Sequence, residues 1–405
     1  MFGNGRLALD MGAHLYDLSP ALRLMLMGVA VALGPLAWIW ARHQNAPTAR
    51  RLRVLTMVTL FLTFDLVVFG AFTRLTDSGL GCPDWPGCYG SASPVGAQQH
   101  IDAAQSAMPT GPVTQSKAWI EMIHRYLATG VGVLILTLTV LTWTASRDER
   151  RRAGGGKPEV RSIVSTWWPG VTLLWVCLQG AFGALTVTMK LFPAIVTLHL
   201  LGGMGLLALL RAQTVRQAQM QEQIVPTLLS VTMRRFLFAG FALLWLQIAL
   251  GGWVSTNYAV LACADFPACQ NSLWPAMDFR QGFTLWRELG AGQDGENISF
   301  QALSAIHYAH RLAAYIVFAV LMALAAGLRR VPALRTQALW LAALVLLQVA
   351  TGLSNVVLGW PLLAAIAHTG GAAALVLVLT GIVLSSRGSP ALAHASTSNA
   401  SRVSA

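Results

Sequence analysis

Apolar runs of bilayer length set the strongest limit on how this chain can fold. Hydrophobic residues make up 55% of the 405 residues and charged residues only 11%. A run of about 20 apolar residues is long enough to cross the hydrocarbon core of a bilayer as a helix. We count nine such segments, near residues 21–41, 53–73, 118–144, 165–188, 192–213, 234–254, 302–327, 334–356 and 361–385. The chain is therefore predicted to be an all-α polytopic membrane protein.

Basic residues gather in alternate connections between these segments, at 42–53, 147–161, 211–235 and 329–335. Short loops rich in lysine and arginine stay in the cytoplasm, so we expect the N-terminus outside and the C-terminus in the cytoplasm. This topology accounts for the net charge of +12, and nucleic-acid binding is not expected. The segment 21–41 is longer than a signal-peptide core and lacks a clear cleavage site, so we interpret it as a retained extra helix.

The sequence contains an internal repeat. The stretch GAFTRLTDSGLGCPDWPGC at 70–88 aligns without a gap with 251–269, and residues 178–203 align with 347–372 at a constant offset of 169. We therefore expect two pseudo-symmetric four-helix transmembrane bundles from an internal duplication. The predicted parts are an extra helix with a cytoplasmic linker at 1–52, an N-terminal bundle at 53–216, a cytoplasmic linker at 217–233, a C-terminal bundle at 234–385 and a disordered cytoplasmic tail at 386–405.

Four of the five cysteines lie in the two long outer loops, Cys82 and Cys88 in the first and Cys263 and Cys269 in the second. Disulfides are expected on the oxidising side of a bacterial envelope. They either hold their loops in place or exchange electrons with a thiol partner. Zinc is less favoured because its cysteine ligands are usually closer in sequence and no histidine is near. Cys177 lies inside a span, and we expect it to be a small buried apolar residue.

Five of the nine histidines fall in predicted helices, where an ionisable group usually has a function. Four of them lie about 10 Å below the outer surface, at ~1.5 Å per residue of helix; these are His124, His199, His310 and His368. In each half one histidine precedes an arginine and the other precedes glycines that remove side-chain bulk. Two imidazoles at equal depth suit the two faces of a haem iron. The alternative is four separate core histidines hydrogen-bonded between helices.

The arginines that follow two of these histidines, Arg125 and Arg311, lie near the outer face. Their guanidinium groups could bind haem propionates. Extension of the side chains to the lipid headgroups is an equally physical account.

Glu121 distinguishes the two halves. It precedes His124 by three residues and so shares its helical face, whereas His307 occupies the same place before His310. A carboxylate there can accept a proton or stabilise positive charge at a porphyrin edge. The alternative is an ordinary carboxylate paired with Arg125 or Lys117. If the site is chemical, the N-terminal half holds the reacting haem and the C-terminal half an electron-transfer haem.

Other polar residues also lie within the spans. Gln179, Gln247 and Gln348 each precede a glycine by four residues, which favours interhelical hydrogen bonds beside a small residue. Asp65 is either part of a proton path or neutral and hydrogen-bonded.

Several of these motifs together resemble the haem A synthase family. They are the 70–88 segment, the Glu-x-x-His-Arg at 121–125, and the later His199, His310 and His368. The resemblance covers about residues 53–385. It implies an enzyme of the bacterial inner membrane that oxidises a methyl group of haem O to the formyl group of haem A, which terminal oxidases use.

The resemblance also implies roles for individual residues. His124 and His199 would bind the substrate haem, Glu121 would be the catalytic carboxylate, and His310 and His368 would bind the iron of a haem b cofactor. It implies disulfides between Cys82 and Cys88 and between Cys263 and Cys269, in periplasmic loops. Expected partners are the haem O-producing farnesyltransferase and oxidase assembly factors, and a homo-oligomer is compatible with the sequence.

Two other functions fit parts of the pattern. A quinone-coupled membrane thiol oxidoreductase would use the loop cysteines as its reactive centre, so Cys82→Ser would abolish its activity. A haem transporter would also show repeats and buried polar residues, but it would not need four histidines at one depth.

Overall fold

The computed structural model describes residues 19–152, 165–292 and 296–387. Within these ranges nine helices are long and apolar enough to cross a membrane, as predicted. They are α1 (Ser19–His43), α2 (Thr48–Leu75), α4 (Gln115–Arg152), α5 (Trp167–Thr188), α6 (Pro193–Gln221), α7 (Val231–Thr256), α9 (Phe300–Leu328), α10 (Arg335–Val357) and α11 (Leu362–Ser385). Shorter helical elements are α3 (Gln98–Ala107), η1 (Ala259–Leu261), α8 (Phe279–Gly282) and η2 (Pro332–Leu334).

Local sequence accounts for several helix ends. Ser230 and Ser299 cap α7 and α9, each accepting a hydrogen bond from the backbone N–H three residues later. α6 begins at Pro193, where the missing N–H costs nothing. Both α4 and α6 continue past their predicted ends at 144 and 213, because the polar residues that follow the apolar runs are good helix formers.

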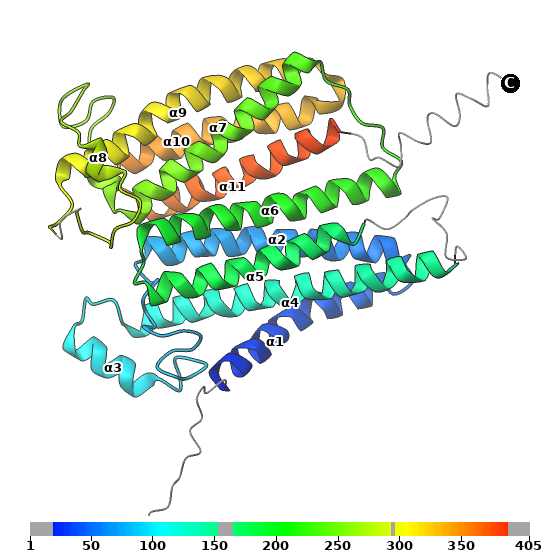
Figure 1. Ribbon diagram of the computed structural model, residues 1–405, viewed down its shortest axis with the longest axis horizontal. Coiled ribbons are helices and arrows are strands. Elements are labelled where there is room, and N and C mark those ends of the chain that lie inside the picture. Colours follow the sequence, from blue (N-terminus) through cyan, green and yellow to red (C-terminus); the bar gives the residue numbers. More distant parts are fainter. Residues whose placement is uncertain (1–18, 153–164, 293–295, 388–405) are drawn as a thin grey trace, which may run out of the picture.

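The long helices form two four-helix groups that lie side by side (Figure 1). We call α2, α4, α5 and α6 the N-terminal bundle and α7, α9, α10 and α11 the C-terminal bundle. α6 packs against α11 at the centre of the interface, flanked by contacts of α2 with α11 and of α6 with α7. This arrangement is consistent with the predicted duplication. α1 packs on α4 and crosses it at an angle (Figure 1).

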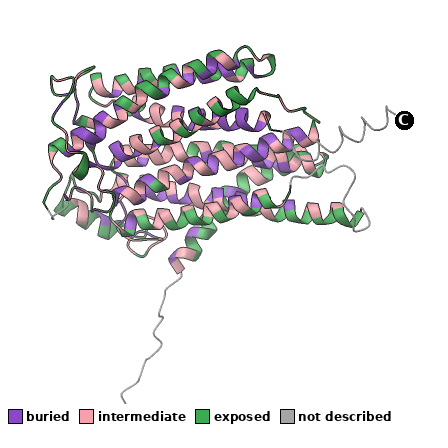
Figure 2. Cartoon of the chain, turned by 45° about the horizontal axis from the view of Figure 1, so that its top comes forward, coloured by how far each residue is buried: buried purple, intermediate pink, exposed green. Residues whose placement is uncertain are grey.

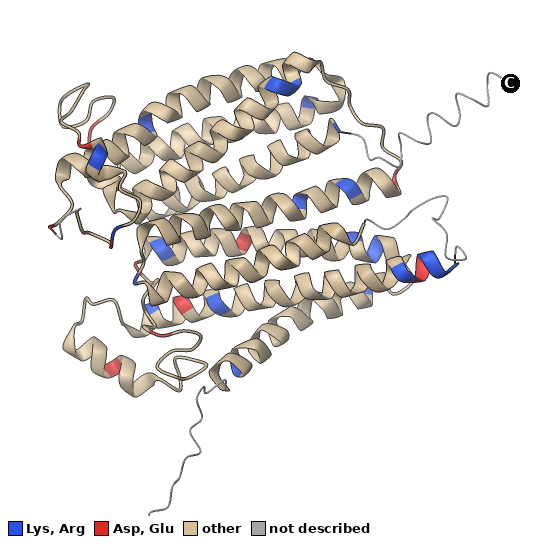
Figure 3. Ribbon diagram, viewed as in Figure 1, with Lys and Arg blue, Asp and Glu red and all other residues tan. Residues whose placement is uncertain are grey.

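Two connecting segments lie at the same end of the molecule, which we call the loop end (Figure 1). Loop 1, residues 76–114, joins α2 to α4 and contains α3; loop 2, residues 257–299, joins α7 to α9 and contains α8. No helix was predicted within either loop, because α3 and α8 are too short and too polar to resemble a membrane span. Basic side chains gather towards the opposite end, on α4, α6 and α7 (Figure 3).

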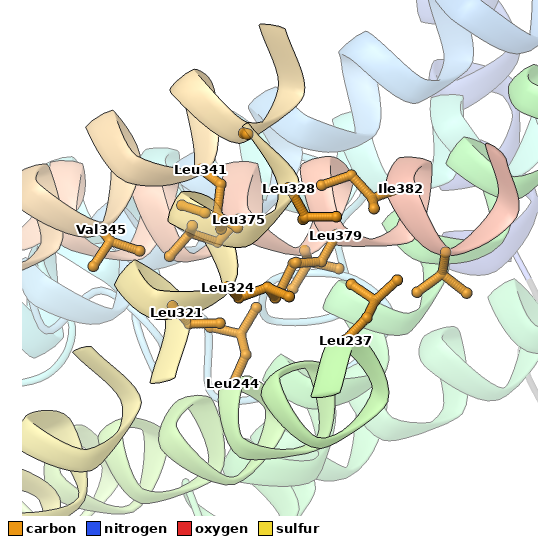
Figure 4. Close-up of a cluster of buried hydrophobic side chains, with 14 of the residues drawn as sticks. Leu237, Leu244, Leu321, Leu324, Leu328, Leu341, Val345, Leu375, Leu379 and Ile382 are labelled. Atoms are coloured by element: carbon orange, nitrogen blue, oxygen red, sulfur yellow. The ribbon is translucent and has the colours of Figure 1, made fainter. Parts of the chain in front are cut away.

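Leucine side chains fill the C-terminal bundle away from the loop end (Figure 4). Leu237, Leu324, Leu341 and Leu379 are each fully buried there. Buried residues face the helix contacts, and many outward faces are exposed (Figure 2). Because large apolar side chains such as Leu363 lie on those outward faces, the surface suits contact with lipid.

Candidate functional site

The four predicted histidine ligands lie in two pairs, one in each bundle. His124 and His199 come from α4 and α6, and His310 and His368 come from α9 and α11. α4 and α6 both pack against α2 and α5, and α9 and α11 both pack against α7 and α10, so the histidines of each pair come from opposite helices of one bundle. All four side chains are half-buried, although each of their helices packs against two neighbouring helices of its bundle.

Each of the four imidazoles lies against a glycine of a neighbouring helix. A Cβ added to the glycine would come within 3.1 Å of the ring for Gly70 and His124, 3.4 Å for Gly183 and His199, 3.0 Å for Gly251 and His310, and 3.2 Å for Gly352 and His368. A larger residue at these positions would push on the ring. The four matched contacts give both bundles the same local architecture around their histidines.

The glycines that follow His199 and His368 lie against side chains of neighbouring helices. Gly202 and Gly371 lie against the side chains of Gln179 and Gln348, while Gly203 and Gly370 lie against valines of α2. Their lack of side chains therefore allows close approach of neighbouring helices. That these glycines also make room for a haem stays a prediction.

Hydrogen bonds to the histidine rings differ between the bundles. His310 Nδ1 lies 3.1 Å from Gln247 Nε2, and His368 Nδ1 lies 3.0 Å from Thr351 Oγ1. His199 Nδ1 is buried and has no hydrogen-bond partner in the described part of the chain. The interhelical role predicted for Gln247 and Gln348 is confirmed, because Gln348 Nε2 donates to the His368 carbonyl oxygen at 3.0 Å. Thr351 was missed by sequence reasoning, since a threonine in a span is ordinary.

Arg125 and Glu121 connect α4 to loop 1. The Arg125 guanidinium donates to the carbonyl oxygens of Asp84 at 2.9 Å and Gly87 at 2.5 Å, and to Glu121 Oε1 at 2.5 Å. Glu121 Oε2 accepts the backbone N–H of Cys82 at 2.7 Å. Of the two partners proposed for Glu121, Arg125 is the one it contacts. Both side chains are buried.

Arg311 does the same in the C-terminal bundle. Its guanidinium donates to the carbonyl oxygens of Cys263 at 2.6 Å and Asp265 at 2.8 Å. Its Nε donates to His307 Nε2 at 3.2 Å, so His307 stands where Glu121 stands in the other bundle. The structure thus shows both arginines bound to their loops, and a further contact with propionates stays a prediction.

The two loops share one internal design. Disulfides join Cys82 to Cys88 and Cys263 to Cys269, as predicted, and all four cysteines are fully buried. Cys177 is free, but it is exposed on α5 rather than buried. The expectation was wrong because a small apolar residue in a membrane helix is as well accommodated by lipid as by the protein interior.

In each disulfide loop an aspartate side chain accepts two backbone hydrogen bonds. Asp84 accepts the backbone N–H groups of Tyr89 and Gly90, and Asp265 accepts those of Gln270 and Asn271. The hydrogen bond from Asn271, aided by that from Gln270, holds the pKa of Asp265 below its ordinary value. The alignment of Asp84 with Asp265 in the repeat was the signal for this shared role.

Asp65 lies on an exposed face of α2 and has no hydrogen bond or ion pair with any other described residue. The described residues also contain no cluster of three or more His, Cys, Asp or Glu side chains suited to a metal ion. The histidine pairs nevertheless fit a haem iron, which takes one imidazole on each face. Each ring lies directly against a glycine, and His199 Nδ1 is buried without a partner among the described residues.

Fold and site together define a class: a multi-pass helical membrane protein with one histidine pair in each of two bundles. Residues 53–380 match the family COX15-CtaA, described as cytochrome oxidase assembly protein. The chain belongs to this family. The matched range includes all four paired histidines and leaves out α1.

Curated relatives agree with the family. A protein named heme A synthase from Shewanella oneidensis is 37% identical over 328 residues, which cover 81% of this chain and 94% of the relative. Another of that name from Mesorhizobium japonicum is 28% identical over 346 residues, covering 82% and 89%. The resemblance to the haem A synthase family is therefore confirmed.

Proposed function

We propose that the chain is a haem A synthase, which oxidises the methyl group of haem O to a formyl group. The observation that carries the proposal is the pair of matched histidine sites, of which only the N-terminal one has a carboxylate, Glu121, one turn from its ligand. The names of the relatives support the same activity.

His124 and His199 bind the substrate iron in this proposal, and His310 and His368 bind haem b. Haem b, when bound, supplies a carrier that takes electrons away from the substrate site. If both imidazoles of a pair bound the iron, no position would remain for oxygen, which would favour removal of electrons. The overall reaction converts R–CH₃ and one water into R–CHO and releases four protons and four electrons. The electrons pass to an acceptor, which is an electron carrier.

Glu121 has two tasks in this scheme. Its carboxylate stabilises positive charge that develops when electrons leave the methyl group, and it can accept a proton from the attacking water. Arg125 and the Cys82 N–H hold both carboxylate oxygens in place. A group fixed before the reaction does not have to reorganise during it.

Burial of the disulfides favours haem chemistry over thiol exchange. All four disulfide-bonded cysteines are fully buried, and a partner thiolate must reach a sulfur atom to exchange with it. We assign these disulfides to loop structure.

The basic residues at the end opposite the loops support an orientation with the loop end in the periplasm and the C-terminus in the cytoplasm. We place the protein in the bacterial inner membrane, with the N-terminal bundle at 53–216 as the substrate unit and the C-terminal bundle at 234–385 as the haem b unit. The haem O-producing farnesyltransferase and oxidase assembly factors are the proposed partners.

Expression in a bacterial host that makes haem O but no haem A tests the activity. Haem A should appear in extracted membranes, and it should be missing from cells with His124→Ala or His199→Ala at equal protein abundance. Wild-type protein that accumulates in the membrane without any haem A would overturn the proposal.

A further inference from the structure

The two histidine pairs are matched in position but differ in what holds their rings. In the C-terminal bundle both Nδ1 atoms face a polar side chain, Gln247 for His310 and Thr351 for His368. In the N-terminal bundle neither His124 nor His199 has a ring hydrogen bond to any residue that the structure describes.

Thr351 sets the orientation of His368 through a chain of two hydrogen bonds. Its hydroxyl donates to the Leu347 carbonyl oxygen at 2.8 Å, so its lone pairs remain to accept a proton from His368 Nδ1 at 3.0 Å. A proton on Nδ1 leaves Nε2 with a free lone pair, which is the form of imidazole that binds a metal.

Gln247 provides the equivalent contact for His310. Its amide nitrogen lies 3.1 Å from Nδ1, and its Oε1 is buried without a partner among the described residues. Rotating the amide by half a turn brings that oxygen to Nδ1, where it accepts the ring proton. The rotation gives up the hydrogen bond that Nε2 donates to the His310 carbonyl oxygen at 3.2 Å and places Oε1 beside that oxygen, a cost that the bond to the ring has to offset.

The repeat shows what replaces these two residues in the N-terminal bundle. Aligning Gly70 with Gly251 places Leu66 opposite Gln247, and the offset of 169 places Phe182 opposite Thr351. Neither side chain can accept a proton. Phe69 instead lies parallel to the His124 ring, with centroids 6.3 Å apart.

We propose that Gln247 and Thr351 are positioning residues that retain haem b permanently, and that Leu66 and Phe182 make the N-terminal pair an exchange site for substrate and product. This inference rests on the proposed function. Partners of a metal-binding imidazole fix its direction and raise its basicity, and losing one typically costs 10- to 100-fold in metal affinity. A cofactor must stay bound through many turnovers, whereas a product must leave.

Gln179 and Gln348 are a natural comparison. They align with each other, so they occur in both bundles, and Gln348 contacts the backbone of His368 rather than its ring. Their side chains lie against equivalent glycines, Gly202 and Gly371, so they do not distinguish the two sites.

The test is the rate at which haem leaves purified protein for an excess of an apo-globin scavenger, followed separately for haem b and haem O. Thr351→Val and Gln247→Leu should each release haem b about 10- to 100-fold faster than wild type. Thr351→Ser keeps the hydroxyl and should retain haem b, and Gln348→Leu is the control for a lost helix contact. The double variant Leu66→Gln/Phe182→Thr places the polar residues of the C-terminal bundle at the aligned positions of the N-terminal bundle. It should slow the release of haem O.

A second measurement separates ring contact from general loosening of the bundle. The reduction potential of the haem b that remains bound should rise in Thr351→Val and Gln247→Leu, because a less basic imidazole stabilises the oxidised iron less well. It should not change in Gln348→Leu. Release rates and potentials equal to wild type in both ring-contact variants would overturn the inference while leaving the proposed function intact. Wild-type protein that binds no haem would overturn the proposed function and this inference with it.

Discussion

Arg125 and Arg311 have the same structural task in the two halves. Each buried guanidinium donates to several carbonyl oxygens of its disulfide loop. Buried charge is tolerated only when it is hydrogen-bonded, and the fork of an arginine can reach several acceptors at once. What differs is the side-chain partner on the same helix, because Arg125 pairs with Glu121 whereas Arg311 donates to His307.

Replacing Glu121 by glutamine tests that difference. Glu121→Gln removes the charge while nearly keeping the volume, so both haem sites should still fill. Conversion should stall at haem O or at the hydroxylated intermediate, with a rate loss of about 10²-fold or more. The measurement is the haem composition of cells carrying the variant as their only copy. His307→Gln, the matched change in the other bundle, should retain far more activity, and normal haem A in Glu121→Gln cells would show that Glu121 is not catalytic.

The ligand assignment in the C-terminal bundle makes a spectroscopic prediction. His310→Ala and His368→Ala should each remove the low-spin haem b spectrum from purified protein, because each leaves the iron with one axial imidazole. His100→Ala, at an exposed position in loop 1, should leave it unchanged. Full haem b in both ligand variants would disprove the assignment.

Among the helices, α1 has a contact surface built from small residues. Gly28 lies against Thr129 of α4, and Gly130 of α4 lies against Val31. Nearer the loop end, Leu24 is buried in the cluster that contains both loop 1 cysteines. Because α1 lies outside the family match at 53–380, we interpret it as an added support for α4 and loop 1.

A matched pair of glycines on α1 tests this support. A side chain at Gly28 would overlap Thr129, while one at Gly34 meets nothing within 4 Å. Gly28→Leu should therefore lower the thermal stability of the purified protein, with a cost of about 1–3 kcal/mol from overpacking. Gly34→Leu should have no effect. Equal unfolding temperatures for the two variants would mean that α1 is not held by this contact.

Elements with a strong pattern of their own were predictable from the sequence. The nine spans follow from length and apolar content, and the disulfides from the repeat and the family resemblance. The contacts of Arg125 and Arg311 were not predictable, because nothing in a linear sequence shows that a loop folds back onto the helix that follows it. The role of Thr351 was not predictable either, because it depends on which face of α10 is turned towards His368.

In the whole molecule, aligned positions of the two halves meet at the loop end. Arg74 donates to the carbonyl oxygen of Ser255 at 2.6 Å, and Tyr258 donates its hydroxyl proton to Asp77 at 2.8 Å. The ungapped alignment of 70–88 with 251–269 pairs Arg74 with Ser255 and Asp77 with Tyr258. Equivalent residues touch in this way only near a twofold axis. These bonds add to the helix packing between the two bundles at the loop end.

In the proposed function one bundle binds a resident haem and the other binds a haem that is being converted. Mass analysis of the haems extracted from purified protein tests it most directly. We predict haem b in wild-type protein, together with a smaller amount of haem O, its hydroxylated intermediate or haem A. His368→Ala should lose haem b and keep haem O, and His124→Ala should do the reverse. Protein without haem, or loss of haem b on changing His124 but not His368, would contradict the account.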